Sequence, residues 1–327
     1  MTKKISVCIT SYNQKNYLTE AIESVINQTI EPWEIIVVDD CSTDGSQEII
    51  DEYAKAYPKL IRPFFHKKNL GIPLNKRFAQ ERANGDLFTY LDGDDRFLPK
   101  KLQIELETLM SNPDARAVYS NFYYIDEYGQ QIKLWADGNI AMPCGNIFRE
   151  VFIFDDFPDS ILLRNELVDY QSMKEVGFYD PDFAIYEDWE WRIRFAKRFK
   201  MIYCPEPLAE YRRHSRCVSV SPTLEHLKYI RKGYFKNFYL LQDLPKPEYL
   251  NIQRKIHYNF ARMHQQSGLE ELSKGKKINA LNDWIKSLQF NPKEIDWHIP
   301  AKLIIPSLFY SRLKFLYKKL NNKLIRN

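Results

Sequence analysis

The stretch FTYLDGDDR, residues 88–96, decides the fold prediction. Residues 87–91 are apolar, aromatic or β-branched, which is typical of a strand that is buried on both faces. Three carboxylates around one glycine end this run, namely Asp92, Gly93, Asp94 and Asp95. Two aspartates placed two positions apart after a buried strand can direct oxygens at one hard divalent cation, Mg²⁺ or Mn²⁺. The same residues are ordinary turn formers, so the stretch predicts either a metal site or a plain Asp-Gly turn.

Strands and helices alternate along the chain on both sides of this stretch. Apolar and β-branched runs predict strands at 5–10, 34–40, 60–66 and 117–121, with a short strand at 201–203. Helical spacing predicts helices within 11–28, 41–57, 73–83, 99–110 and 187–199, whereas 123–158 and 204–221 read as a hairpin turn and loops. This alternation predicts an α/β fold with a mostly parallel sheet and helices on both of its faces.

Polar side chains gather where three of the predicted strands end. The clusters are Thr10 to Asn13, the pair Asp39-Asp40, and Asp92 to Asp95. Parallel α/β sheets bind ligands outside the carboxyl ends of their strands, so the clusters predict a ligand site there. No GxGxxG follows the first strand and no GxxxxGK[ST] occurs, which argues against a dinucleotide site and a P-loop.

The composition is that of a globular protein with an unevenly charged chain. Its 327 residues are 44% hydrophobic and 28% charged, and the formal net charge is only +4, so the whole chain does not resemble a nucleic-acid binder. After Trp297 there are seven Lys or Arg and no acid, which leaves −3 for the residues before that point. The basic character therefore belongs to the C-terminal segment.

Cysteine usage and the N-terminus both predict a cytoplasmic protein. The five cysteines are scattered without a CxxC pair, so neither a zinc site nor a disulfide framework is predicted. The residues after Lys3-Lys4 lack the cleavage region of a signal peptide, and no window approaches 18 uninterrupted apolar residues.

Six sequence blocks together resemble the family 2 glycosyltransferases of the GT-A fold, over about residues 4–220. The blocks are SVCITSYNQKNYLTEAIESVINQT (6–29), EIIVVDDCSTDGS (34–46), NLGIPLNKRF (69–78), GDLFTYLDGDDRFLPKKL (85–102), GFYDPDFAIYEDWEWRIRFAKR (177–198) and YRRHSRCVS (211–219). Their order and spacing are far more specific than a single DxD. The resemblance implies a catalytic domain over 1–220 that transfers a sugar from a nucleotide diphosphate donor, usually with inversion at the anomeric carbon.

The resemblance implies a metal site and a nucleotide site. Asp94 would ligate Mn²⁺ or Mg²⁺, Asp92 would face the ribose or a metal-bound water, and Asp95 is a weaker candidate. His214 matches a further ligand in several members, although a histidine among arginines is also commonly a surface residue. The implied donor contacts are Thr10, Tyr12, Asn13, Asp40, less surely Asp39, and Asn69, Gly71, Lys76, Asp92 and Gly93.

One of these positions departs from the family pattern. In the NxGxxxxRN block the usual Arg is Lys76 and the following Asn is Arg77. Lysine keeps the positive charge but lacks the planar fork that suits the edge of a base. The departure puts the expected preference for uridine partly in doubt.

The resemblance also implies the residue that activates the acceptor. Asp188, with Glu187 beside it, matches the ED motif, whose Asp removes the proton of the attacking hydroxyl group. Acids in a first helical turn also stabilise the helix dipole, so these two residues could instead be N-terminal capping residues. Trp189 and Trp191 could stack on an acceptor sugar or pack against the sheet.

These observations predict a metal-dependent, inverting glycosyltransferase of the hexosyltransferase type. A UDP-sugar is the favoured donor, and the acceptor would be a glycan or a lipid-linked saccharide in surface polysaccharide synthesis, with no nucleic acid involved. One alternative is a nucleotidyltransferase that makes a nucleotide-sugar, although its usual Gly-rich N-terminal loop is missing. Another is a non-catalytic scaffold that binds nucleotide-sugars.

The C-terminal region, residues 221–327, is predicted to be helical. Apolar spacing indicates helices at 224–241, 249–267 and 269–290, the last resembling half of a tetratricopeptide-type hairpin. Within 304–325 an apolar stripe alternates with basic residues, giving a basic amphipathic end at about 302–327. Such a helix can lie on the anionic inner face of the cell membrane, which would make the protein peripheral, or it can pack on its own domain.

Overall fold

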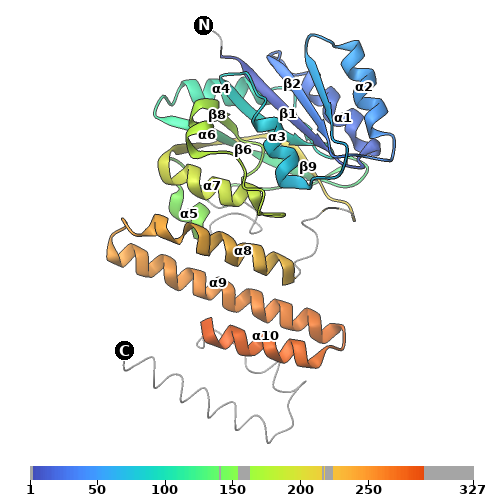
Figure 1. Ribbon diagram of the computed structural model, residues 1–327. Helices are drawn as coiled ribbons and strands as arrows, with labels where there is room; N and C mark the ends of the chain where they lie inside the picture. The colour runs from blue at the N-terminus through green and yellow to red at the C-terminus, as the bar shows by residue number, and fades with distance from the viewer. Residues whose placement is uncertain (1–2, 140, 154–162, 216, 218–223, 291–327) are drawn as a thin grey trace, which may run out of the picture. The chain divides into compact units, whose positions relative to one another are not determined.

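A computed structural model describes residues 3–139, 141–153, 163–215, 217 and 224–290 (Figure 1). The chain forms two compact units. The first comprises Met1–Ser221 and Tyr229–Leu240, and the second comprises Pro222–Lys228 and Leu241–Asn327.

The first unit is built on a nine-stranded sheet with the order β3-β2-β1-β4-β8-β6-β9-β5, in which β7 pairs with β6. The strands are β1 (Ile5–Ser11), β2 (Glu34–Asp39), β3 (Ile61–Phe65), β4 (Leu87–Asp92), β5 (Arg96–Phe97), β6 (Ala115–Ile125), β7 (Gln131–Leu134), β8 (Leu167–Asp169) and β9 (Lys200–Arg212). All of them run in one direction except β5, β7 and β8, so the sheet is mostly parallel, as predicted.

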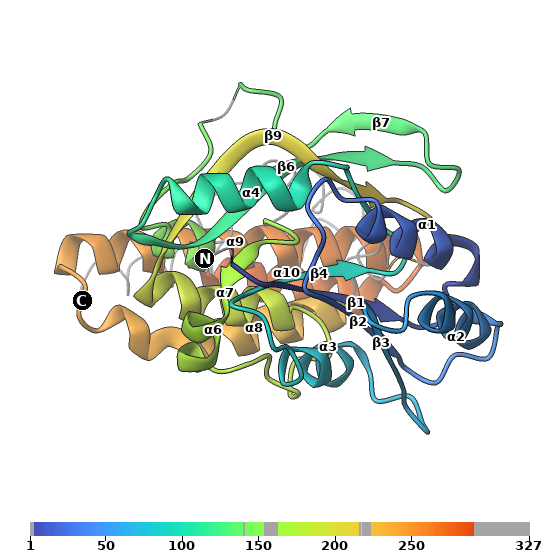
Figure 2. The same cartoon turned by 90° about the horizontal axis from the view of Figure 1, so that it is seen from above.

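Helices cover both faces of this sheet, which explains why its central strands are apolar. Every residue of β1 and β2 is buried. Figure 2 shows α1 and α4 on one face and α3 and α6 on the other. The helices of this part are α1 (Lys15–Ile26), α2 (Ser46–Ala56), α3 (Ile72–Gln80), α4 (Lys101–Met110), α5 (Phe148–Ile153), α6 (Tyr170–Val176) and α7 (Glu187–Arg198).

Two predictions about strands are wrong. The short strand at 201–203 is the beginning of β9, which continues through the predicted basic loop as far as Arg212. The prolines in CPEP indicated a loop, but the pairing of β6 with β9 shifts register around Asn121 and accommodates them. The strand predicted at 117–121 likewise extends to Ile125, where the predicted hairpin turn leads into β7.

The helices after residue 223 are α8 (Leu224–Asn237), the 3₁₀-helix η3 (Phe238–Leu241), α9 (Lys246–Ser273) and α10 (Lys277–Phe290). In the second unit α9 and α10 lie side by side, joined by a short turn (Figure 1). The predicted break at Gly268 is wrong, because α9 continues through it. A Cβ at Gly268 would lie 2.7 Å from Trp284 Nε1, so this glycine allows close packing of the two helices rather than a turn.

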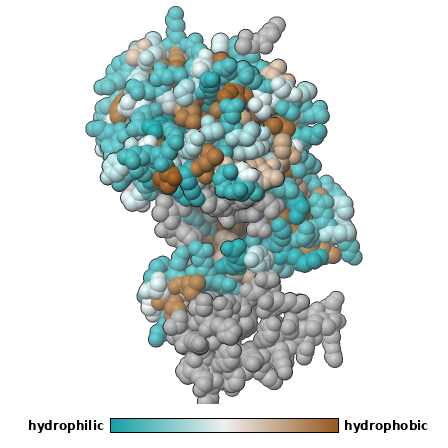
Figure 3. All heavy atoms as spheres, turned by 180° about the vertical axis from the view of Figure 1, so that it is seen from behind, coloured by the Kyte–Doolittle hydropathy of each residue, from teal (hydrophilic) through white to brown (hydrophobic). Residues whose placement is uncertain are grey.

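Polar residues cover most of the described surface in the view of Figure 3, and apolar side chains are scattered among them. None of the helices that the structure describes combines the length and the apolar composition needed to cross a bilayer. The predicted amphipathic segment 304–325 lies outside the described residues.

Candidate active site

The DGDD sequence forms a tight turn at the carboxyl end of β4. The amide of Asp95 donates to the carbonyl of Asp92 at 2.9 Å, and the amide of Gly93 donates to the carbonyl of Thr10 at 2.9 Å. A Cβ at Gly93 would lie 2.5 Å from Gln14 Oε1 and 2.9 Å from Thr10 O. Glycine is therefore required for the ends of β1 and β4 to approach each other. The turn places three carboxylates, those of Asp92, Asp94 and Asp95, close to this junction.

Asp92 is held between two cations. Its Oδ1 lies 3.0 Å from Lys76 Nζ and its Oδ2 lies 2.9 Å from Arg164 Nη2. The hydroxyl of Thr10 donates to Oδ1 at 3.4 Å. Burial opposes ionisation of Asp92, but the charges of Lys76 and Arg164 outweigh it and lower the pKa below its ordinary value. Asp92 is thus an ionised residue with fixed partners.

Asp95 has a different environment from its neighbours. It is buried, and it accepts hydrogen bonds from Arg164 Nη2 at 3.1 Å and from the backbone amide of Arg212 at 2.8 Å. Burial raises its pKa well above the ordinary value, and the charges of Asp94 and Asp92 add to this effect although Arg164 opposes it. Asp95 therefore joins the DGDD turn to β9 rather than facing outward.

Arg164 is a site residue that the sequence did not reveal. One of its nitrogens, Nη2, bonds both Asp92 and Asp95, and its guanidinium lies over the ring of Tyr211, 3.8 Å from the centroid. Its Nε is buried without a hydrogen-bond partner among the described residues. No motif marks this arginine, and only the topology places it beside the acidic turn.

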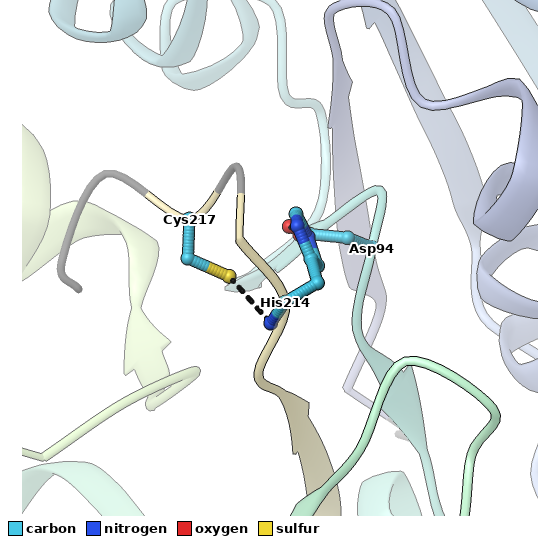
Figure 4. Close-up of side chains that lie close together, drawn as sticks. All are labelled: Asp94, His214 and Cys217. Atoms are coloured by element: carbon cyan, nitrogen blue, oxygen red, sulfur yellow. Dashed lines mark hydrogen bonds and ion pairs between the residues drawn. The ribbon is translucent and has the colours of Figure 1, made fainter.

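Asp94 and His214 lie side by side (Figure 4). His214 Nε2 lies 3.0 Å from Asp94 Oδ2, and the Sγ of Cys217 belongs to the same cluster, whose ligand atoms all lie within 4.8 Å of one another. The imidazole stacks on Tyr17 with 5.1 Å between ring centroids, which orients it. A carboxylate oxygen and an imidazole nitrogen are ligands that Mn²⁺ accepts, so the residues present fit a divalent cation.

The start of α7 brings the ED pair to the acidic turn. Lys76 Nζ lies 3.4 Å from Glu187 Oε1, so one ammonium group contacts both Glu187 and Asp92. Burial raises the pKa of Glu187 to about 7, even though Lys76 opposes the shift. Asp188 remains about a quarter exposed, with 24% of its side chain accessible. Its negative charge also acts on Asp92, so the two residues belong to one site.

Arg192 fixes the position of Asp188. Its Nη1 lies 2.8 Å from Asp188 Oδ2, and its other nitrogens contact Glu166 at 2.6 and 3.1 Å. Its Nη2 also donates to the hydroxyl of Tyr90, a β4 residue, at 3.0 Å. Burial opposes ionisation of Asp188, but Arg192, followed by Lys76 and Arg164, lowers its pKa to about 2. Asp188 is therefore an ionised carboxylate tied to the strand that ends in DGDD.

The prediction that Trp189 and Trp191 stack on a sugar is wrong. Both side chains are buried, and their indole nitrogens donate to the carbonyls of Val151 at 2.8 Å and Gly177 at 2.9 Å. The ring of Trp189 packs edge-on against Tyr234. The alternative, structural packing, is the correct interpretation, because the first turn of α7 presents its carboxylates to the site and its indoles to the interior.

The Asp39-Asp40 pair orders two loops. Asp39 is fully buried, and its carboxylate accepts hydrogen bonds from Ser42 and Gln47. Its contact with a donor stays a prediction. The two oxygens of Asp40 accept hydrogen bonds from the amides of Leu70 at 2.7 Å and Gly71 at 2.8 Å. Asp40 thereby holds the loop that leads into α3, the helix that carries Lys76.

The remaining predicted donor residues lie around the end of β1. Asn13 has a left-handed backbone with φ 52°, and its amide and Oδ1 bond Ser42 and Thr43, so it connects the loops after β1 and β2. Tyr12 is about half exposed and Asn69 is exposed. Their contacts with a nucleotide stay predictions.

Comparisons with known proteins agree on one family. The model of the family described as glycosyl transferase family 2 matches residues 6–186. The putative teichuronic acid biosynthesis glycosyltransferase TuaG of Bacillus subtilis is 38% identical over 111 residues, which are 34% of this chain and 44% of TuaG. The chain spans less than two thirds of the curated relatives that it matches, and it covers 63% of three mycobacterial ones.

Two solved structures share the fold. The structure of S. aureus TarS (1–349) in complex with UDP-GlcNAc has a TM-score of 0.65 at 18% identity, covering 88% of this chain and 80% of that one. The mannosyltransferase PcManGT from Pyrobaculum calidifontis in complex with GDP-Man and Mn²⁺ has a TM-score of 0.58 at 16% identity. The match covers 98% of this chain and 84% of PcManGT. At these identities the similarity concerns the fold, and it confirms the predicted fold class.

Proposed function

Because the chain belongs to glycosyl transferase family 2, we propose that it transfers a sugar from a nucleotide diphosphate donor to an acceptor hydroxyl group. The observation that carries this proposal is the position of Lys76. Its Nζ lies 3.0 Å from Asp92 and 3.4 Å from Glu187, so the residues proposed for donor binding and for acceptor activation share one cation.

The donor side of the proposal concerns the acidic turn. Asp94 and His214 would hold Mn²⁺ or Mg²⁺, which when bound neutralises the charge that develops on the departing diphosphate. This assignment is supported by the 3.0 Å approach of the two side chains and by the Mn²⁺ complex of PcManGT. A UDP-sugar is the favoured donor, in line with the UDP-GlcNAc complex of TarS. The exposed Tyr12 and the ordered loop at Asp40 would contact the nucleotide.

The acceptor side concerns the start of α7. Asp188 would accept the proton of the attacking hydroxyl group, and attack on the face opposite the diphosphate would invert the anomeric carbon. With a pKa of about 2, Asp188 is ionised at neutral pH and available as a proton acceptor. Arg192 holds the carboxylate in one orientation, and the exposed part of Asp188 leaves room for a hydroxyl group.

The acceptor would be a glycan or a lipid-linked saccharide in surface polysaccharide synthesis. TuaG, a relative over part of the chain, is named for the synthesis of teichuronic acid, which supports this class of product. The protein would act on the cytoplasmic side of the membrane, where the basic segment 302–327 could bind anionic lipid. Truncation after Phe290 should then weaken cosedimentation with anionic vesicles, and unchanged cosedimentation would refute the membrane role.

A nucleotide-sugar panel with and without Mn²⁺ tests the transferase proposal. Release of UDP, GDP or dTDP from one donor should depend on the metal and should fall sharply in Asp188→Asn. The matched control is Asp182→Asn, because Asp182 lies shortly before α7 and its side chain is 76% exposed. Release of pyrophosphate would instead indicate a nucleotidyltransferase. Donor binding without any release, unchanged by Asp188→Asn, would indicate a non-catalytic scaffold.

A further inference from the structure

A turn after β9 presents a histidine and a cysteine on the same side as the DGDD turn. The amide of Cys217 donates to the carbonyl of His214 at 3.1 Å, and the amide of His214 donates to Cys217 Sγ at 3.4 Å. Residues three apart in such a turn direct their side chains together. Figure 4 shows the thiol of Cys217 and the carboxylate of Asp94 beside His214, with a dashed line for the hydrogen bond from the His214 amide to Sγ.

Arg212 contacts both the acidic turn and the His-Cys turn. Its Nε donates to the carbonyl of Asp94 at 2.8 Å, and its own carbonyl accepts from Cys217 Sγ at 3.4 Å. Arg212 is itself buried, with an ion pair to Glu20 at 2.7 Å. One buried residue therefore contacts both turns, through its side chain to the carbonyl of Asp94 and through its own backbone carbonyl to the thiol of Cys217.

We propose that Cys217 is the third protein ligand of the cation held by Asp94 and His214. The role of that cation in sugar transfer rests on the proposed function. One oxygen, one nitrogen and one sulfur form a donor set that Mg²⁺ disfavours, because Mg²⁺ takes oxygen ligands and rarely accepts thiolate. The site selects a transition metal, and the order of affinity is Zn²⁺ above Mn²⁺ and Mn²⁺ above Mg²⁺. On binding, the thiol releases its proton to solvent and sulfur bonds to the metal as thiolate.

Titration of the full chain with Co²⁺ tests the ligand directly. A thiolate bound to Co²⁺ gives a sulfur-to-cobalt charge-transfer absorption in the near ultraviolet, which wild type should show. Cys217→Ser should lose this absorption and bind Co²⁺ at least about tenfold more weakly. Cys144→Ser is the matched control, because Cys144 is an exposed thiol outside the cluster, and it should behave as wild type.

Two further measurements use only the wild-type protein. Zn²⁺ should displace Co²⁺ readily, whereas a ~100-fold excess of Mg²⁺ should not. Bound Co²⁺ should protect Cys217, but not Cys144, from alkylation detected by mass spectrometry. The inference is overturned if wild type shows no charge-transfer absorption, if Cys217→Ser retains it, if Mg²⁺ displaces Co²⁺ equally well, or if alkylation of Cys217 is unaffected by the metal.

Nucleotide release from the same preparations separates this inference from the proposed function. Charge-transfer absorption without release from any donor would refute the transferase proposal and leave the ligand assignment standing. Metal-dependent release without the absorption would refute the ligand assignment alone.

Discussion

Replacing Glu187 with glutamine should change how the stability of the first unit depends on pH. Glu187 is buried, and its pKa is raised from 4.5 to about 7. Because the folded value exceeds the unfolded value, the folded state binds the proton more tightly. The stability that Glu187 contributes is therefore complete below about pH 4.5 and is lost as the pH rises through about 7. Glutamine resembles the protonated acid and cannot lose a proton.

The two pKa values give the size of the effect. Between about pH 5 and about pH 8.5, linkage predicts that wild type loses about 2.5 kcal/mol of unfolding free energy relative to Glu187→Gln. The loss arises because burial opposes the carboxylate more strongly than the ammonium group of Lys76 favours it. The free energy of unfolding of the variant should therefore increase relative to that of wild type as the pH rises, whatever the difference between the two proteins at pH 5.

Urea unfolding followed by tryptophan fluorescence measures this difference. Trp189 and Trp191 are buried in the same helix and report on its packing. Asp182→Asn is the control, because the side chain of Asp182 is 76% exposed and its charge is not among those that shift the pKa of Glu187. A difference between Glu187→Gln and wild type that stays flat from pH 5 to pH 8.5, or that changes with the opposite sign, would refute the reasoning.

Three other changes have defined outcomes. Asp188→Asn should lower the rate of nucleotide release by about 10²- to 10⁴-fold with donor affinity nearly unchanged, as steady-state kinetics and calorimetry can establish. Gly93→Ala should cost about 1–3 kcal/mol in denaturant unfolding, because its Cβ would lie 2.9 Å from the carbonyl of Thr10. Arg192→Met should cost about 3–5 kcal/mol, because it leaves the buried carboxylate of Glu166 without its cation, and Tm should fall accordingly.

The sequence was informative where hydrophobic pattern and local turns decide the structure. The apolar runs at β1, β2 and β4 predicted buried parallel strands, because a strand covered on both faces must be apolar throughout. The DGDD stretch predicted the end of a strand. In the structure it forms a tight turn that also gathers the acidic side chains, so the two readings of this stretch do not exclude each other. The resemblance implied a role for the DGDD stretch and another for the ED pair, and the structure brings Lys76 into contact with Asp92 of the first and Glu187 of the second.

The sequence was less informative where distant contacts override local preference. Pro205 and Pro207 suggested a loop, yet the irregular pairing with β6 keeps β9 continuous. Gly268 suggested a helix end, yet its missing side chain makes room for Trp284. The sequence did not show whether Trp189 and Trp191 face a ligand or the interior, because that depends on which face of α7 packs against the rest of the unit.

Arg164 and Cys217 show which parts of the site needed coordinates. Arg164 lies in no motif, and its charge matters only because two aspartates distant in sequence lie beside it. Cys217 follows His214 by three positions, a spacing typical of chelating pairs, which was a usable signal.

The shared ammonium group of Lys76 limits how this protein can be re-engineered or can diverge. A substitution at Asp92 intended to change the sugar nucleotide would also remove one of the charges that raise the pKa of Glu187. Lys76 would then lose one of its two ion pairs and keep the one with Glu187. Under the proposed function, a change at Asp92 would thus alter the electrostatics of both the donor side and the acceptor side of the site, and evolved variants should carry paired changes at these positions.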